Sequence, residues 1–178
     1  PNGSGKTTLF NCIAGALRPD SGTVRFRGEP ITGLPAHQVL RRGIARTFQF
    51  VRPFPHMTVA DNVLVGRLYG RSRDGTLSAA RRAVGEMLHF VGLEGRDHLL
   101  ARQLTSMDRK RVELARCLAT GPELLLLDEL MAGLNPAEAM AATDLIRRIR
   151  ARGITIIMVE HNVRAVLDVS DRIMVLHH

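Results

Sequence analysis

The first eight residues of the chain, P-N-G-S-G-K-T-T, match the phosphate-binding pattern G-x-x-x-x-G-K-[ST] with only its first glycine missing. Gly3 and Gly5 allow the main chain to turn tightly, so that successive N–H groups can point toward phosphate oxygens. Lys6 can reach the β- and γ-phosphates, and the Thr7 hydroxyl can bind Mg²⁺. The residues predicted to contact a nucleotide in this loop are Asn2, Gly3, Ser4, Gly5, Lys6, Thr7 and Thr8.

A helix is predicted directly after this loop, because apolar residues repeat at helical spacing at Leu9, Phe10, Ile13, Ala14 and Leu17. The positive N-terminal end of that helix would face the bound anion. The alternative is a glycine-rich turn that only begins an ordinary helix. A strand should deliver such a loop into a sheet, and neither that strand nor an initiator Met precedes Pro1. We therefore expect the chain to be a fragment, lacking N-terminal strands, that folds poorly alone.

Length and composition predict one globular domain with a real core and room for a small subdomain, since 45% of the 178 residues are apolar. No apolar run approaches the roughly 18 residues that cross a bilayer, so a membrane role would need a partner. The formal charge of +8 comes from scattered arginines with few aromatic residues between them, and no direct nucleic-acid partner is expected. Cys12 and Cys117 lack metal-like or redox-like spacing, which indicates reduced cysteines.

Strands and helices are expected to alternate along much of the chain. Apolar patterns predict strands at residues 23–27, 44–48, 124–127, 155–159 and 172–176. Helical periodicity and capping residues predict helices at residues 35–42, 79–91, 109–118, 136–151 and 163–169. This alternation predicts an α/β fold with a parallel sheet covered on both faces. Residues 51–118 contain no convincing strand and are predicted to form a small helical subdomain beside a core of residues 1–50 and 119–178.

Polar residues follow three of the predicted strands. Gln49 follows the strand at 44–48, Asp128 and Glu129 follow the leucine run, and Glu160 and His161 follow the strand at 155–159. Each of them alone could be a residue that leaves a strand for solvent. In parallel α/β sheets, however, ligands bind outside the carboxyl ends of the strands, so we expect these residues and the phosphate loop to share one edge.

The chemistry of these residues suits hydrolysis of a nucleoside triphosphate. Asp128 offers the carboxylate that Mg²⁺ requires, because this ion keeps several waters and needs only one or two protein oxygens. Glu129 could accept a proton from the water that attacks the γ-phosphate. His161 could donate a hydrogen bond to the charge that develops there.

The order of these motifs resembles the nucleotide-binding domain of ATP-binding cassette (ABC) transporters over essentially the whole chain. The motifs are the phosphate loop, a glutamine, L-T-x-x-x-x-x-R-V-E-L-A-R, L-L-L-L-D-E, A-G-L-N-P and V-E-H. The resemblance implies a P-loop NTPase fold with a RecA-like core, and ATP with Mg²⁺ as ligands. It implies that Gln49 is the Q-loop residue, with a catalytic and a Mg²⁺-binding role. It also implies that Asp128 and Glu129 are the Walker B pair, that residues 132–135 are the D-loop and that His161 is the switch histidine.

The same resemblance implies partners. A second ABC ATPase subunit, identical or different, would pair head to tail with this chain, and both would dock on integral membrane permease subunits at the cytoplasmic face of the cell membrane. The segments G-I-A-R-T-F-Q, V-R-P-F and M-T-V-A-D-N resemble the ATPases of branched-chain amino acid importers. The expected cargo is therefore a branched-chain amino acid or a related small polar solute such as urea or a short amide.

One motif departs from the family. Where the family has L-S-G-G-Q, or in this branch L-x-Y-G-Q, the chain has L-T-S-M-D at residues 104–108. Thr105 and Ser106 could still contact the γ-phosphate held by the partner, but Met107 is bulky where glycine permits close approach. Asp108 adds negative charge beside an anionic ligand, so this signature is expected to be weakened. The alternative is that Thr105 and Asp108 only form a capping box for the next helix.

Two other classes of function stay open at this stage. A soluble ABC-type ATPase of translation or DNA maintenance would share most of these motifs. The DNA-repair type carries long coiled-coil insertions, for which the 55 positions from Gln49 to Leu104 leave no room. A subunit that binds ATP without turnover is the other alternative, prompted by Met107 and Asp108.

Overall fold

The computed structural model describes residues 3–48, 53–71 and 76–176 of the chain. A parallel sheet with the strand order β3-β4-β5 lies at its centre, formed by β3 (Ile44–Arg46), β4 (Leu124–Asp128) and β5 (Thr155–Val159). Leu124 lies opposite Ile44 on one side and opposite Thr155 on the other, which fixes the register. The α/β class with a parallel sheet is thereby confirmed.

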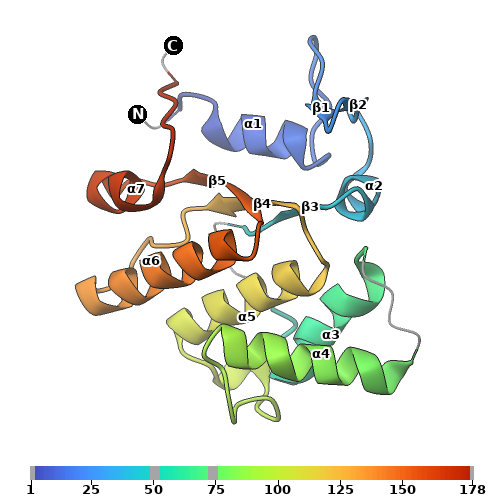
Figure 1. The fold of residues 1–178 in the computed structure, drawn as a ribbon, viewed down its shortest axis with the longest axis vertical. Coiled ribbons are helices and arrows are strands. Elements are labelled where there is room, and N and C mark those ends of the chain that lie inside the picture. The colour runs from blue at the N-terminus through green and yellow to red at the C-terminus, as the bar shows by residue number, and fades with distance from the viewer. Residues whose placement is uncertain (1–2, 49–52, 72–75, 177–178) are drawn as a thin grey trace.

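Helices cover both faces of this sheet (Figure 1). On one face lies α1 (Lys6–Ile13), and on the other lie α5 (Ser106–Ala119) and α6 (Pro136–Ala151). The leucines of β4 alternate between two buried clusters: Leu124 and Leu126 pack on the α1 side with Phe10, whereas Leu125 and Leu127 pack on the other side. Burial of both faces explains why β4 is an unbroken apolar run rather than an alternating one.

A small hairpin and a short helix follow α1. The hairpin pairs β1 (Arg25–Phe26) with β2 (Glu29–Pro30) in antiparallel fashion; β1 lies within the strand predicted at residues 23–27 but is shorter, and β2 was not predicted. Its two turn residues, Arg27 and Gly28, have φ values of 53° and 82°, and positive φ at both positions matches the twist of a two-residue hairpin. Helix α2 (Ala36–Arg41) begins after Pro35 and ends before Gly43, as predicted.

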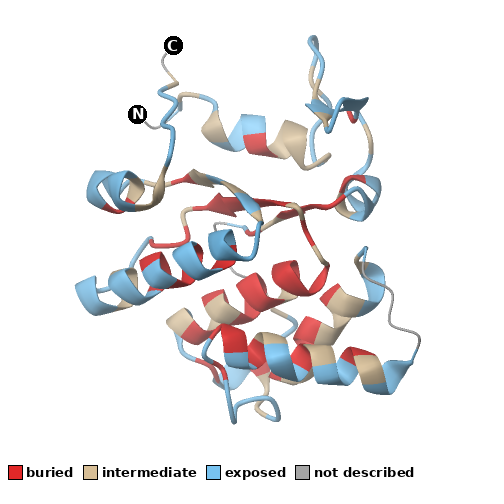
Figure 2. Cartoon of the chain, in the orientation of Figure 1, coloured by how far each residue is buried: buried red, intermediate tan, exposed pale blue. Residues whose placement is uncertain are grey.

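Three helices pack together below the sheet: α3 (Val59–Tyr69), α4 (Leu77–Phe90) and α5, with a short 3₁₀ turn, η1 (Ala101–Gln103), before α5. Figure 2 shows that α5 is buried along most of its length between the sheet and the other two helices. In the described part of residues 51–104 no strand is assigned, and the one β-bridge joins Thr58 to Leu100. Helix α3 was not predicted separately, and the domain boundaries at residues 50 and 118 stay a prediction.

The predictions for the C-terminal third differ in their outcome. Helix α6, β5 and α7 (Val163–Val169) have the predicted boundaries. The strand predicted at residues 172–176 is wrong: these residues form no ladder with any described strand, and Met174 and Val175 are exposed. A short apolar run forms a strand only where a neighbouring strand supplies main-chain partners. Within the described residues we find no helix with the length and apolar character needed to cross a bilayer.

Candidate functional site

The phosphate loop leads directly into α1, as predicted. Gly3 and Gly5 both adopt left-handed φ values, 80° and 85°, and Gly5 is the N-cap of the helix. Lys6 is the first residue of α1, and its Nζ atom donates to the Ser4 Oγ atom at 2.9 Å. Thr7 and Thr8 lie in the first turn and are exposed. Asn2 lies outside the described residues.

The predicted base and switch histidine meet at the carboxyl ends of β4 and β5. Glu129 follows β4 directly, with a φ of 51°, and its N–H donates to the carbonyl of Val159, the last residue of β5. His161, two residues farther along, lies with its Nε2 atom 2.8 Å from Oε1 of Glu129. The left-handed conformation turns the chain sharply at Glu129, so the carboxylate leaves the strand toward the neighbouring strand's end. The contact places the Glu129 carboxylate and the His161 imidazole side by side and orients them toward each other.

Asp128 is held by an arginine that the sequence analysis did not single out. Its Oδ2 atom forms an ion pair with Nη2 of Arg46 at 2.8 Å, and both side chains are almost fully buried, at 2% and 6% exposure. Arg46 also donates to Oδ1 of Asn11 on α1 at 2.5 Å, and its guanidinium lies over the rings of Phe10 and Phe48. The signal in the sequence is one charged residue inside the predicted strand I-A-R-T-F.

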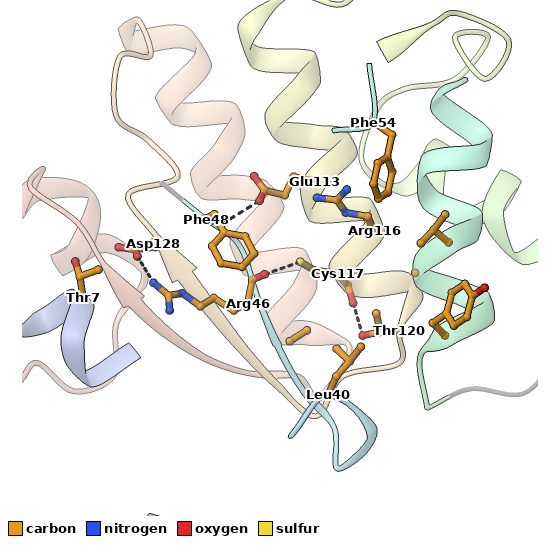
Figure 3. Close-up of a pocket in the computed structure, with 14 residues that line it drawn as sticks. Thr7, Leu40, Arg46, Phe48, Phe54, Glu113, Arg116, Cys117, Thr120 and Asp128 are labelled. Carbon is orange, nitrogen blue, oxygen red and sulfur yellow. Dashed lines mark hydrogen bonds and ion pairs between the residues drawn. The ribbon is translucent and has the colours of Figure 1, made fainter. Parts of the chain in front are cut away.

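Arg46, Phe48 and Asp128 line a cavity of about 740 Å³, drawn in Figure 3. Thr7 and Asp128, the two described residues predicted to bind Mg²⁺, both line it; Gln49, the third, lies outside the described residues. Half of the other lining residues have aliphatic or aromatic side chains: Leu40, Ala45, Phe48, Phe54, Val65 and Tyr69. A hydroxyl and a carboxylate oxygen fit Mg²⁺ that keeps waters and phosphate oxygens as its other ligands. Among the described residues no three His, Cys, Asp or Glu side chains gather to hold a metal by themselves.

A buried glutamate joins α5 to the end of β3. Oε1 of Glu113 accepts a hydrogen bond from the main-chain N–H of Phe48 at 3.0 Å (Figure 3). Burial raises the pKa of Glu113 to about 7, although this hydrogen bond and the charges of Arg116 and Lys110 oppose the shift. One helical turn farther, Sγ of Cys117 donates to the carbonyl of Arg46 at 3.1 Å. Side chains of α5 therefore hold the strand that leads to Gln49, a contact that sequence spacing does not reveal.

Replacing Glu113 with glutamine is expected to make folding less sensitive to pH. The carboxyl binds its proton more tightly in the folded state, so its contribution to stability is complete below the unfolded pKa, near 4.5, and is lost as the pH rises toward 7. The stability of the variant relative to wild type should rise by about 3 kcal/mol between pH 4 and pH 8. Urea unfolding at several pH values measures this. A stability difference between variant and wild type that stays constant with pH would contradict the prediction. Glu86→Gln, on the exposed face of α4, is the control.

The departing signature begins helix α5. Thr105 is the N-cap: its Oγ1 atom accepts from the N–H of Asp108 at 3.2 Å and donates to Oδ2 of Asp108 at 2.8 Å. Asp108 is buried and also forms ion pairs with Arg96 and Arg111. Its negative charge is therefore compensated within this chain. Thr105 caps the helix as the alternative interpretation predicted, but Asp108 accepts from the Thr105 hydroxyl, so only the N-cap half of a capping box is seen. Ser106 is the first residue of the helix and is exposed.

Comparison with known proteins identifies the same family as the order of the sequence motifs. The family model described as ABC transporter matches residues 1–132. The chain is 41% identical to the high-affinity branched-chain amino acid transport ATP-binding protein LivG of Salmonella typhimurium, covering 99% of this chain and 74% of that protein. It is 38% identical to the corresponding protein BraF of Pseudomonas aeruginosa, with the same coverage.

Solved structures of ATP-binding cassettes share the fold. A nucleotide-free cassette from an ABC transporter superposes with a TM-score of 0.84 at 32% identity, covering 96% of this chain and 72% of that chain. An ABC transporter cassette in its ADP conformation superposes with a TM-score of 0.83 at 33% identity, covering 96% of this chain and 71% of that chain. With the phosphate loop, the Glu129–His161 pair and the parallel sheet in place, these matches show that the chain belongs to the ABC transporter family, as an ATP-binding cassette ATPase.

Proposed function

We propose that this chain is the ATP-hydrolysing subunit of a transporter that imports branched-chain amino acids or a related small polar solute. Relatives at 38–41% identity carry the name of branched-chain amino acid transport ATP-binding proteins and match 99% of the chain. The observation that carries the hydrolytic part is the 2.8 Å contact between Glu129 and His161 at the edge of the sheet.

The residues of this site have distinct roles in the proposed reaction. Main-chain N–H groups of the loop at residues 2–8 and the Lys6 ammonium bind the phosphates. Thr7, Asp128 and Gln49 would hold Mg²⁺, which when bound neutralises charge on the phosphate oxygens. The ion pair with Arg46, which also contacts Asn11, fixes the position of the Asp128 carboxylate between α1 and β4.

Glu129 is the general base in this proposal. Its carboxylate takes a proton from the attacking water, and the hydrogen bond from Nε2 of His161 to Oε1 fixes the orientation of that carboxylate. In this tautomer the imidazole donates, and it can shift toward the developing charge on the γ-phosphate as the reaction proceeds. The 54% exposure of the His161 side chain leaves it free to make that movement.

The proposed partners are a second ABC ATPase subunit, paired head to tail, and integral membrane permease subunits that hold the pair at the cytoplasmic face of the cell membrane. Exposed aromatic side chains around the cavity support a docking surface for the permease beside the end of β3. Phe48 and Tyr69 are 56% and 70% exposed, and Phe54, which also lines the cavity, is 45% exposed. Movement of the permease would then reach Gln49 through the neighbouring Phe48.

The contacts of the signature favour two different ATPase subunits over two copies of this chain. The Thr105 hydroxyl is engaged by Asp108, and a phosphate would have to approach beside that carboxylate. A partner with an intact signature would supply the γ-phosphate contact for the nucleotide held by Lys6.

Uptake of leucine by the reconstituted transporter tests this proposal. The intact protein is purified with its co-expressed permease, partner ATPase and binding protein, and MgATP is enclosed in the vesicles. We expect ATP-dependent leucine uptake that isoleucine and valine inhibit and that urea does not, with two different ATPases in each complex. Uptake of urea or a short amide instead would reassign the cargo. ATP turnover without any permease in the purified complex would favour a soluble ATPase, and binding without turnover would favour a regulatory subunit.

A further inference from the structure

A buried lysine that the proposed mechanism does not use holds the segment directly after Glu129. Lys110 lies in the second turn of α5 and is 9% exposed. Its Nζ atom donates to the carbonyl oxygen of Leu130 at 2.8 Å and to that of Ala132 at 2.5 Å. Lys110 is one of only two lysines in a chain whose basic residues are otherwise arginines. A side chain of α5, the helix that begins with the signature, therefore binds the main chain of residues 130–132, which we call the catalytic loop.

A glutamate at the end of β5 binds the same segment. Glu160 is the first residue after β5, and its Oε1 atom accepts a hydrogen bond from the main-chain N–H of Met131 at 2.9 Å. Residues 130–132 are thus held by two side chains of opposite charge, one from α5 and one from the end of β5. Glu160 directly precedes His161, so the same strand end contacts Glu129 and the residues that follow it.

Lys110 lies in surroundings that are poor in solvent, and Glu160 is half-buried. Burial lowers the pKa of the Lys110 ammonium, and four carboxylates oppose the shift: Glu160, Glu138, Glu113 and Glu129. Burial raises the pKa of Glu160, and the Met131 N–H and Lys110 oppose that shift, whereas Glu129 adds to it. The space beside Lys110 is lined mainly by apolar side chains, among them Met107, Leu114, Leu130, Leu134 and Leu145. Water cannot readily replace the Lys110 ammonium there, so its loss leaves the carbonyls of Leu130 and Ala132 without that partner.

We propose that Lys110 and Glu160 are positioning residues that together clamp residues 130–132 from α5 and from the end of β5, and thereby hold Glu129 in place and connect it to α5. Glu129 itself has a left-handed φ of 51°, a conformation that persists only where its surroundings impose it. Because Thr105 and Ser106 begin the helix that carries Lys110, a displacement of the signature reaches the base through this contact. The inference rests on the role of Glu129 as general base given under the proposed function.

The test is Lys110→Met in the assembled transporter, since methionine keeps an unbranched apolar side chain and removes the donors. Turnover of MgATP (kcat) should fall at least about 10-fold, while the KM for ATP changes by less than about 3-fold, because the phosphate loop is untouched. Hydrogen exchange of the amides of residues 129–132 should become at least about 10-fold faster. Lys110→Arg, which keeps charge and donors, should recover most of the turnover.

Arg109→Met is the matched control, because Nη2 of Arg109 donates to the carbonyl of Arg102, away from the catalytic loop. It should leave kcat and the exchange of residues 129–132 unchanged. Equal losses of kcat in Lys110→Met and Arg109→Met, with equal decreases in Tm, would overturn the clamp. A wild-type kcat in Lys110→Met would also overturn it. If Lys110→Met fails to assemble, Glu160→Met tests the same segment from β5 with the same readouts and the same two outcomes.

A double variant and a reference variant complete the design. If the two residues act as one clamp, Lys110→Met with Glu160→Met should lose little more turnover than the larger single loss, whereas additive losses would contradict joint action. Glu129→Gln is measured beside them. Normal turnover in Glu129→Gln would show that Glu129 is not the general base. A large loss of turnover in Glu129→Gln, with wild-type turnover and exchange in Lys110→Met and Glu160→Met, would overturn the clamp alone.

Discussion

Replacing Glu129 with glutamine is expected to lower MgATP turnover by the assembled transporter roughly 10²- to 10⁴-fold, the range typical for loss of a general base. The amide keeps the size of the side chain, and its oxygen can still accept the hydrogen bond that Nε2 of His161 makes to Oε1. What it loses is the ability to take a proton from water. Phosphate release at saturating ATP measures the loss, and ATP binding should stay within about 3-fold of wild type.

The contrasting variant is Glu86→Gln, which makes the same change of charge at an exposed position of α4. It should leave turnover within about 2-fold of wild type. A Glu129→Gln protein that keeps more than a tenth of the wild-type turnover would show that another group accepts the proton. A variant that no longer binds ATP would indicate that Glu129 acts in ground-state binding instead.

Replacing Gly66 with alanine should cost about 3 kcal/mol of the free energy of unfolding, the upper part of the range for inserting a methyl group into a packed interface. Helices α3 and α5 approach most closely here: a Cβ atom at Gly66 would lie 2.2 Å from the carbonyl oxygen of Arg116. That oxygen belongs to the main chain of a buried helix and cannot rotate away. The helices must separate, which also disturbs the packing of Val59 and Val63.

Gly85→Ala is the matched control for that substitution. Gly85 lies on the exposed side of α4, and nothing in the described structure lies within 4 Å of the Cβ atom that alanine would add. Alanine there should stabilise the intact protein by about 0.5–1 kcal/mol, because glycine loses more main-chain entropy when a helix forms. Urea unfolding measures the change in the free energy of unfolding for both variants, which should be a loss for Gly66→Ala and a gain for Gly85→Ala. Similar losses at both positions would contradict the close approach at Gly66.

Local sequence signals were sufficient to predict a helix or strand where residues close in sequence mark its first and last positions. Helix α6 begins at Asn135, whose side chain accepts from the N–H of Glu138 while the Glu138 carboxylate accepts from the N–H of Asn135. Pro136 occupies its first turn, and the predicted range of 136–151 is the observed one. β5 was likewise predicted with its observed bounds, from a continuous apolar run between turns.

Helix α3 could not be found in this way, because its buried face is not a plain apolar stripe. Asn62 is fully buried there and binds the carbonyls of Phe54, Met57 and Thr58 through its side chain. Gly66 is buried because α5 approaches closely. Both residues weaken a helical prediction, and both are explained only by their neighbours in the folded chain.

By itself the sequence determined the fold class, the phosphate loop and the residue types of the site, because each depends on residues close together in the chain or on motifs in a fixed order. Tertiary structure decided which side chains hold that site in place. Arg46 meets Asp128, and Glu113 meets Phe48, across 82 and 65 positions of sequence. Such contacts depend on how strands and helices pack, and a buried charge can be recognised as a partner only when the group that compensates it has been brought beside it.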